Sequence, residues 1–427
     1  MSPRNPNQTN EISMNGSWQP SSLAALALLG VACATQQVSP GKLLPDGRLI
    51  YPETKTVDQV DTLHGVKVAD PYRWLEDADS PGTRAWVKNQ NQLTFEFLDT
   101  IPERNNIRRR LRKLWNHERF GVPVKRGERY FYTRNDGLQN QSVLYMTDSL
   151  HSAGRILLNP NTLSKDGTVA LSRWSVSDDG KHLAYSTSAA GSDWQEWRVR
   201  NVDTGRNLGD RLNWVKFSGA AWRRDGSGFY YSRYDAPKSG KKMSGINLNQ
   251  KLYFHRLGTS QSTDDLVYHN PNNPKWGYGA SVTEDDRYLI ITIWQGTDRR
   301  NRVYYRDLRS EDAKVVKLFD KFDADYSFIG NDGKMFYFRT DLDAPRGRVI
   351  AIEVGKPDKI KEIIPQADET LRWASHLNNQ LIANYLKDAH SQVKVFSLDG
   401  KMEREISLPG IGSASGFRGR SDASETF

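Results

Sequence analysis

The hydrophobic and polar positions of this chain repeat one unit several times. Each unit is a short polar turn, usually rich in Asp and Gly, followed by a strand in which bulky residues alternate with smaller or polar ones. The clear copies are residues 125–133, 177–186, 222–232, 283–292 and 331–340, and a weaker sixth copy is 378–386. Successive turns lie about 46–60 residues apart, and a repeat of that length built from short strands predicts one four-stranded β-propeller blade per repeat.

A second strand follows in every unit and precedes another polar turn. These strands are residues 143–147, 197–201, 251–255, 302–306, 348–352 and 393–397. We expect each of them to end its blade, which gives six complete blades. Residues 408–412 and 416–419 indicate the opening of a seventh. The pattern therefore predicts a mainly β fold over residues 117–427, a seven-bladed type of β-propeller that is truncated after about six blades.

A different pattern precedes the repeats. Residues 81–98 carry Trp86, Leu93 and Leu98 at helical spacing, and Ser80-Pro81 is a favourable N-cap and first-turn pair. A second helix is predicted from Pro102 to about Trp115. We expect residues 46–116 to form a helical N-terminal segment, and residues 1–45 to be a leader followed by a linker.

The composition supports the β assignment, and the distribution of charge bears on whether the chain binds nucleic acid. The 427 residues include 12 Trp, 18 Tyr and 15 Phe, which favour strands and wide interiors between sheets. The formal net charge is +9. The densest basic run is Arg104, Arg108, Arg109, Arg110, Arg112 and Lys113. It shares its helix with an apolar stripe, so we interpret it as a solvated helix face, and since no nucleic-acid motif accompanies it we expect no nucleic-acid partner.

Cys33 is the single cysteine, so the chain forms no intrachain disulfide. It follows an apolar run, residues 23–32, that has the length of a signal-peptide core. Two readings of the site remain open. Ala32-Cys33-Ala34 resembles a signal-peptidase site, whereas Gly30 to Cys33 loosely resembles a lipoprotein site at which a lipidated Cys33 would attach the chain to a membrane. Both predict a periplasmic or secreted protein; the alternative is a cytoplasmic chain with an unstructured N-terminal extension.

Several motifs are specific enough to indicate a family. Asp70-Pro-Tyr-Arg-Trp-Leu-Glu-Asp-Ala-Asp79, with Gln90-Asn91 in the following helix, resembles the prolyl oligopeptidase family of serine peptidases. Further matching segments occur in the expected order at residues 191–194, 215–218, 249–253, 257–259, 274–276 and 408–412. The resemblance covers about residues 50–427.

The resemblance implies a two-part serine endopeptidase that cleaves short proline-containing peptides and needs no cofactor or metal. In this family an α/β-hydrolase domain carries Ser, Asp and His, and a seven-bladed propeller covers its active site. The N-terminal helical segment packs on the hydrolase domain. We expect that catalytic domain to be missing from this chain and to be its principal partner.

The residues themselves agree with that expectation. A hydrolase nucleophile needs the tight elbow written G-x-S-x-G, and this sequence contains none. The histidines, which are scattered over blades and turns, are His64, His117, His151, His182, His255, His269, His376 and His390. We therefore predict no catalytic residue in the chain, and no peptidase activity of the chain alone.

The resemblance also suggests two positions near the far end of the peptide site. An aromatic position of the family falls at Val176 and a cysteine position at Val267, and both valines depart from the family pattern. Either the substrate-binding subsites differ here, or these valines are ordinary strand residues.

Two other classes of function remain as alternatives. A stand-alone propeller could serve as an exported binding or scaffold module, provided that its ring closes. A propeller glycosidase would need carboxylates that converge on the axis, whereas the Asp residues here lie mainly in turns, where they accept backbone hydrogen bonds. No His, Asp and Glu cluster has the spacing of metal ligands, so we expect no metal site. If the catalytic domain is missing, the apolar residues of the helical segment are expected to be exposed and to bind a hydrophobic dye.

Overall fold

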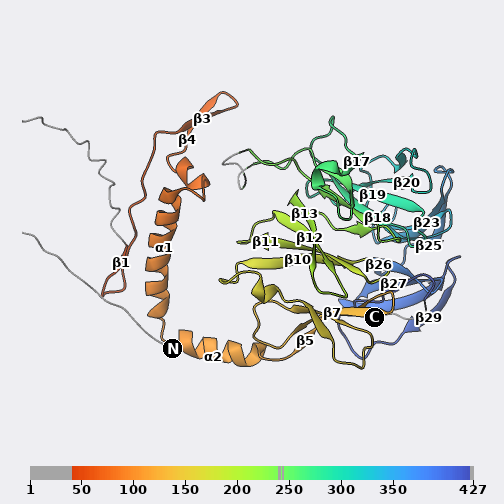
Figure 1. Ribbon diagram of the computed structural model, residues 1–427, viewed down its shortest axis with the longest axis horizontal. Helices are drawn as coiled ribbons and strands as arrows, with labels where there is room; N and C mark the ends of the chain where they lie inside the picture. Colours follow the sequence, from red (N-terminus) through yellow and green to blue (C-terminus); the bar gives the residue numbers. More distant parts are fainter. Residues whose placement is uncertain (1–40, 239–241, 243–244, 424–427) are drawn as a thin grey trace, which may run out of the picture.

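The computed structural model describes residues 41–238, 242 and 245–423. Six antiparallel sheets of four or five strands stand side by side, and a segment with two helices leads into the first of them (Figure 1). The mainly β propeller of six blades that the repeats predict is confirmed. Most of the leader, including Cys33, lies outside the described residues.

The first three blades are formed by residues 119–268. Blade 1 contains β5 (Arg119–Phe120), β6 (Val124–Arg126), β7 (Arg129–Asn135), β8 (Val143–Thr147) and β9 (Arg155–Leu158), followed by the 3-10 helix η2 (Pro160–Thr162). Blade 2 contains β10 (Val169–Val176), β11 (His182–Ala189), β12 (Gln195–Asn201) and β13 (Asn207–Val215). Blade 3 contains β14 (Ala221–Trp222), β15 (Gly228–Arg233), β16 (Lys251–Arg256), η3 (Gln261–Thr263) and β17 (Asp265–Tyr268).

The other three blades follow the same order. Blade 4 contains β18 (Trp276–Val282), β19 (Tyr288–Gln295), β20 (Arg302–Asp307) and β21 (Val316–Phe319). Blade 5 contains β22 (Tyr326–Asp332), β23 (Met335–Thr340), β24 (Arg348–Glu353) and β25 (Ile360–Ile364). Blade 6 contains β26 (Thr370–Leu377), β27 (Gln380–Lys387), β28 (His390–Ser397) and β29 (Met402–Ile406).

The strands expected to end each blade are in fact third strands, and this part of the sequence prediction is wrong. A fourth strand follows each of them and pairs with it at the outer edge of the sheet. Strand β29, for example, has the sequence Met-Glu-Arg-Glu-Ile, and four of its five residues are exposed. An outer edge strand with so little buried surface does not show the alternation on which the sequence prediction depends.

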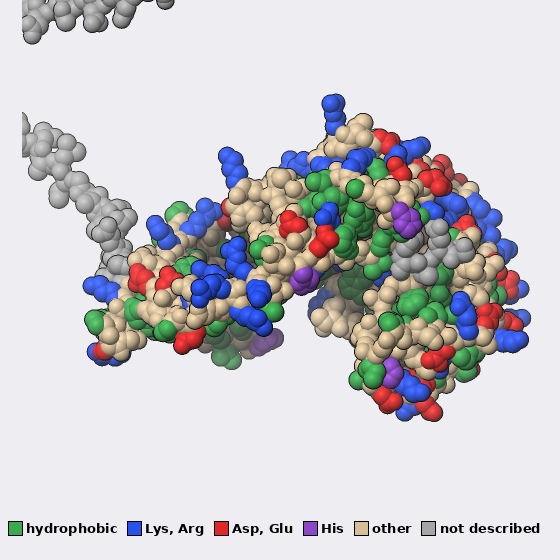
Figure 2. All heavy atoms as spheres, turned by 90° about the horizontal axis from the view of Figure 1, so that it is seen from below, with side chains coloured by type: hydrophobic (Ala, Val, Ile, Leu, Met, Phe, Trp, Pro, Cys, Tyr) green, Lys and Arg blue, Asp and Glu red, His purple; other side chains and the backbone are tan. Residues whose placement is uncertain are grey.

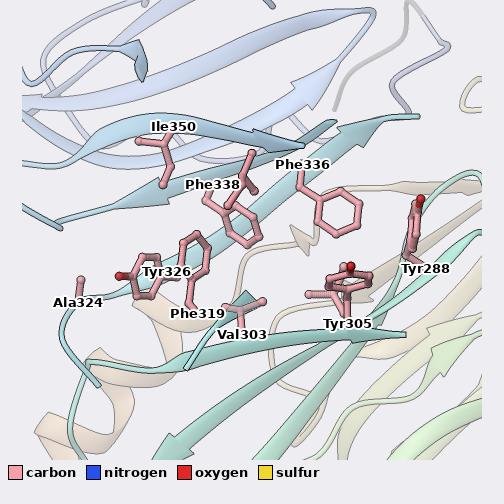
Figure 3. Close-up of a cluster of buried hydrophobic side chains, with 11 residues drawn as sticks. Tyr288, Val303, Tyr305, Phe319, Ala324, Tyr326, Phe336, Phe338 and Ile350 are labelled. Carbon is pink, nitrogen blue, oxygen red and sulfur yellow. The ribbon is translucent and has the colours of Figure 1, made fainter. Parts of the chain in front are cut away.

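The interior of the propeller lies between neighbouring sheets and is rich in aromatic rings. Between blades 4 and 5 the rings of Phe319 and Tyr326 stack with centroids 4.0 Å apart, and the ring of Phe336 meets that of Tyr288 edge-on at 4.9 Å (Figure 3). Phe336 and Phe338 have no solvent exposure. Burying a side chain of this size stabilises a fold by about 1.5–3 kcal/mol, so these interfaces hold the blades together.

The polar turns of the repeat use their carboxylates within the turn. Oδ1 of Asp179 accepts hydrogen bonds from the Ser177 hydroxyl (2.6 Å) and the Lys181 amide (3.0 Å). Oδ1 of Asp285 accepts equivalent bonds from the Thr283 hydroxyl (2.6 Å) and the Arg287 amide (3.2 Å). These two aspartates shape the hairpin between the first two strands of a blade, which confirms the structural reading of the repeat.

Residues 407–423, called the tail below, follow β29 and contain no helix or strand among those described. The expected opening of a seventh blade therefore consists of irregular chain. It runs across one face of blade 6, where Leu408, Ala414 and Phe417 pack against a buried cluster formed by Leu377, Ile382 and Val393. One open face of the six-bladed array is thus covered.

Residues 41–116, called the arm below, stand to one side of the propeller (Figure 1). The arm contains β1 (Lys42–Leu43), β2 (Leu49–Ile50), β3 (Val60–Leu63), β4 (Val66–Ala69), η1 (Arg73–Glu76), α1 (Pro81–Asp99) and α2 (Arg104–Trp115). The two helices were predicted, whereas the β1–β2 and β3–β4 hairpins were not. As expected, Ser80 caps α1, since its hydroxyl accepts a hydrogen bond from the Thr83 amide at 3.2 Å. Within the described part of the chain, no helix is long and apolar enough to cross a membrane.

Candidate functional site

The histidines of the described residues do not form a nucleophile pair. No imidazole among the described histidines shares a hydrogen bond with a serine hydroxyl, and the imidazoles of His117 and His390 contact backbone carbonyls. The acid and base chemistry of a serine peptidase needs a histidine within hydrogen-bond reach of the nucleophile. The part of the chain that the structure describes contains no such arrangement.

One histidine does form a buried charged constellation, which the sequence did not reveal. His255 of β16 lies between two carboxylates, with Nε2 3.0 Å from Oδ1 of Asp210 and Nδ1 2.7 Å from Oδ1 of Asp264. The side chains of all three residues are fully buried. Asp210 belongs to blade 2 and His255 to blade 3, so the cluster joins two blades. The Tyr231 hydroxyl donates a further hydrogen bond to Oδ2 of Asp264 at 2.6 Å.

The two carboxylates fix the charge of this imidazole. Burial on its own lowers the pKa of His255, but the hydrogen bonds and charges of Asp210 and Asp264 act in the opposite direction and raise it to about 9. The imidazole is therefore protonated near neutral pH and donates from both nitrogens. Both ring nitrogens are occupied by the carboxylates of Asp210 and Asp264, so the cluster acts as a structural tie between blades 2 and 3 and offers no free nitrogen to a nucleophile.

A second cluster surrounds Lys216, at the end of the blades opposite the polar turns. Its ammonium lies 4.1 Å from the ring centroid of Trp194 and donates a hydrogen bond to Oδ1 of Asn247 at 3.1 Å. Burial lowers the pKa of Lys216. A pocket of about 370 Å³ adjoins the same tryptophan and is lined in part by Tyr234 and Asn249. A cation and an aromatic ring thus lie beside a hollow at this end of the propeller.

The two valines that the family resemblance singled out lie in different interfaces. Val176 ends β10 and is buried among Phe131, Leu183 and other residues between blades 1 and 2. Val267 lies on β17, the outer strand of blade 3, and packs partly buried against a different cluster. The structure does not bring them together in one cluster. Cys33 lies outside the described residues, and the described residues contain no group of His, Cys, Asp and Glu that could hold a metal ion.

Both helices of the arm carry exposed apolar side chains. Phe95 of α1 is 54% exposed and Trp115 of α2 is 61% exposed, and Val87, Phe97, Ile107, Leu111 and Leu114 are exposed beside them. Of the residues in these two helices, only Thr83 and Leu93 are buried. Lys and Arg side chains gather over α2 next to this apolar surface (Figure 2). Helices with an apolar face of this size normally pack on another part of a protein.

A second unpartnered surface, called the blade-1 face below, lies on the side of blade 1 that points away from blade 2. Tyr132 and Tyr145 stack there with ring centroids 5.6 Å apart, Arg134 lies over Tyr145 at 5.9 Å, and Phe120 and Ile156 are more than half exposed. Seen from the side of β5, β7 and β29, the molecule is hollowed between two lobes (Figure 2). The blade-1 face thus resembles the interior of the other interfaces but has no sheet against it.

Comparison with known proteins gives a consistent result. The family described as the prolyl oligopeptidase N-terminal beta-propeller domain matches residues 52–427. The chain is 39% identical over 383 residues to a prolyl endopeptidase of Elizabethkingia meningoseptica, covering 89% of this chain and 53% of that protein. It is 33% identical to a prolyl endopeptidase of Dictyostelium discoideum, covering 86% of this chain and 57% of the relative.

Solved structures agree with these relatives. The chain superimposes on prolyl oligopeptidase B from Galerina marginata, bound to a 35-residue hydrolysis and macrocyclization substrate, with a TM-score of 0.77 at 28% identity. That match covers 88% of this chain and 56% of the other. The same protein without substrate gives a TM-score of 0.68. The chain therefore spans about half the length of the relatives that it matches.

Proposed function

Because the chain belongs to the prolyl oligopeptidase family through its N-terminal β-propeller domain, we propose that it is the propeller portion of a serine endopeptidase that cleaves short peptides after proline. The observation that carries this proposal is the match over residues 52–427 to relatives named prolyl endopeptidases, of which it covers about half. In this proposal the catalytic serine, aspartate and histidine belong to an α/β-hydrolase domain outside these residues. The propeller restricts which peptides reach them.

The two unpartnered surfaces support a missing partner of this kind. The arm exposes apolar side chains on both of its helices, and the blade-1 face exposes Phe120 and Ile156 beside a half-buried, stacked pair of tyrosines. Exposed apolar surface of this extent usually marks a contact with another domain or chain. We propose that the hydrolase domain covers the arm, and that the remaining strands of a seventh blade cover the blade-1 face.

The proposal assigns the propeller a role without covalent chemistry. Its interior is filled with aromatic and aliphatic side chains, and its buried histidine is held by two carboxylates, so the described residues bind and position rather than react. The proline-specific cleavage would depend on the hydrolase domain, where an oxyanion hole and a nucleophile elbow belong.

The test is reconstitution. An α/β-hydrolase domain with a G-x-S-x-G motif, sought first in the coding sequence beyond codon 427, is produced together with this chain, and cleavage of a fluorogenic proline-containing peptide is measured. We expect cleavage with both parts together and none with this chain alone. The matched control carries alanine in place of the motif serine and is expected to be inactive. Failure of every such domain to bind this chain would contradict the proposal.

A stand-alone binding or scaffold module is the second candidate, and one observation favours it. The tail covers an open face of blade 6 with Leu408, Ala414 and Phe417, so one of the two ends of the array is already closed. Sedimentation and dye binding separate the two candidates. A monomer that unfolds cooperatively and binds no hydrophobic dye would favour the stand-alone module, since its surfaces would need no partner.

A further inference from the structure

The tail does more than cover blade 6, because its last residues reach across to other blades. It first follows the face of blade 6. There the side-chain amide of Asn384 donates to the Ala414 carbonyl at 3.0 Å, and the Ser375 hydroxyl donates to the Phe417 carbonyl at 2.9 Å. The rings of Trp373 and Phe417 lie 6.0 Å apart. The tail thus crosses the face of this sheet from β28 to β26 before it turns.

The tail then meets the turn between β26 and β27. This turn consists of Asn378 and Asn379, with φ values of 49° and 54°, the left-handed conformation that a two-residue hairpin of type I′ requires. Their amides point outward and donate to the carbonyls of Arg420 and Ser421, at 3.2 and 2.8 Å. The tail therefore satisfies two backbone donors that the hairpin leaves free.

From the same position the tail binds blades that do not adjoin blade 6. Both the amide and the hydroxyl of Ser421 donate to Oε2 of Glu284, at 2.8 and 2.7 Å, and Glu284 lies in the β18–β19 turn of blade 4. The guanidinium of Arg420 lies 3.9 Å from Oδ2 of Asp178, in the β10–β11 turn of blade 2. A segment that touches the first turns of blades 2, 4 and 6 at once lies where these turns converge on the propeller axis.

The neighbouring turns are already tied to one another in pairs. Arg223 of blade 3 makes a bidentate contact with Asp286 of blade 4. The side-chain amide of Asn331, in blade 5, donates to Oδ2 of Asp285, in blade 4, at 3.0 Å. The Gly127 amide of blade 1 donates to the Asp178 carbonyl of blade 2 at 2.8 Å. These contacts join blade 1 to blade 2 and blade 4 to blades 3 and 5, and the tail adds links from blade 6 to blades 4 and 2.

We propose that Arg420 and Ser421 form a clasp that holds the first turns of blades 2, 4 and 6 together at the propeller axis, by linking the hairpin turn of blade 6 to Glu284 and Asp178. The central contact is the pair of charge-assisted hydrogen bonds from Ser421 to Glu284, since hydrogen bonds to a carboxylate are stronger than those between neutral groups. Arg420 adds a positive charge beside Asp178 and contributes less, because its contact is longer. The clasp is a property of this chain itself and does not depend on the proposed peptidase function.

Hydrogen exchange on the complete 427-residue chain tests the clasp, with Ser421→Ala, Glu284→Ala and the double variant compared with the parent. We expect each single variant to accelerate exchange at the amides of Asn378 and Asn379, and at β26 and β27, by about tenfold or more. Glu284→Ala removes both hydrogen bonds, whereas Ser421→Ala removes only that of the hydroxyl, so the double variant should match Glu284→Ala and fall short of the sum of the two single effects. Ser421→Thr, which keeps the hydroxyl, should retain most of the protection.

Matched controls are Ser413→Ala, in an exposed part of the tail, and Glu311→Ala, on an exposed loop of blade 4. Neither should change exchange in blade 6. The proposal is overturned if Ser421→Ala accelerates exchange only at Asn378 and Asn379 while β26 and β27 remain protected, because the tail would then be a local cover. Independent, additive effects of the two substitutions would overturn it as well.

Discussion

The interface between blades 4 and 5 and the helical arm are built from the same kinds of apolar side chain but bury them to opposite extents. In the interface, Phe336 and Phe338 have no exposure; the ring of Phe336 contacts those of Tyr288 and Tyr305, and the ring of Phe338 contacts that of Phe319. In the arm, Phe95 is 54% exposed and Trp115 is 61% exposed. The amphipathic pattern is present in both regions, but only one of them has a second surface to pack against.

This difference shows that the propeller blades bury their apolar side chains against one another, whereas the arm does not bury its own. Packed aromatic interfaces account for the stability of the propeller, because each buried ring removes a large apolar area from water. The helices of the arm are held mainly by local contacts, such as the hydrogen bonds from Trp86 to Thr54 at 2.9 Å and from Trp74 to the Lys55 carbonyl at 2.8 Å. Perturbations of the propeller should therefore change global unfolding, whereas perturbations of the arm should stay local.

The largest effect is expected from Phe336→Ala, which leaves a cavity between blades 4 and 5. We expect a loss of about 3–5 kcal/mol in the free energy of unfolding, measured by urea denaturation. The matched control is Phe95→Ala in the arm, where removal of an exposed ring should change the unfolding free energy by less than about 0.5 kcal/mol. Equal effects of the two substitutions would contradict the comparison.

The next largest effect is a loss of stability at alkaline pH through the cluster of Asp210, His255 and Asp264. The pKa of His255 in the folded chain is about 9, above the unfolded value of about 6.5, so protonated His255 stabilises the fold. This contribution is complete below about pH 6.5 and is lost as pH rises through about 9, which corresponds to roughly 2–4 kcal/mol over that range. The measurement is the unfolding free energy as a function of pH.

Two variants sharpen the pH experiment. His255→Gln should be less stable than the parent at pH 7 and should lose most of the decline between pH 7 and pH 10. His390→Gln, which alters an exposed histidine, should keep the decline of the parent. A parent chain whose stability does not fall over this range would show that the imidazole is not the protonated tie between blades 2 and 3.

A smaller and local effect is expected at the start of α1. Ser80→Ala removes the hydroxyl that accepts from the Thr83 amide, and should destabilise α1 by about 1 kcal/mol, seen as faster hydrogen exchange in its first turns. Ser80→Asp keeps a capping oxygen and serves as the control. The midpoint of global unfolding should not move. A shift of that midpoint as large as the local effect would mean that the arm and the propeller unfold as one unit.

The smallest effect on stability belongs to the exposed residues of α2. Leu111→Gln together with Leu114→Gln should reduce the fluorescence of a bound hydrophobic dye and change the unfolding free energy by less than about 0.5 kcal/mol. Leu266→Gln, at an exposed residue of β17, is the control and should leave dye binding unchanged. If neither the double variant in α2 nor Leu266→Gln reduces dye binding, the dye binds another apolar surface, for example the blade-1 face.

The sequence predicted the strands that carry several bulky residues directly after an Asp-rich turn. Strand β19 is one of them, because it follows such a turn and its residues from Tyr288 to Ile291 are all buried. The inner and outer strands of the blades were largely missed. Strand β14 has only two residues, and β29 is mostly charged and exposed, so neither has a hydrophobic periodicity to detect.

The buried cluster around His255 could not be predicted for a different reason. Asp210 lies 45 residues before His255, and the two meet only because blade 2 packs on blade 3. No local spacing encodes such a contact. The clasp joins residues that lie still further apart in the sequence. Glu284 and Ser421 are separated by 137 residues and come together only at the propeller axis. Contacts between blades thus depend on how the blades pack around the axis, and the repeat pattern predicts the blades without giving the residues that meet.

The central proposal is that these residues provide the propeller of a peptidase and not its catalytic machinery. The corresponding measurement is hydrolysis of a fluorogenic proline-containing peptide by the purified 427-residue chain alone. We predict no turnover above the buffer rate at any pH from 6 to 9. Turnover that copurifies with the chain and is abolished by a serine-directed inhibitor would contradict the claim.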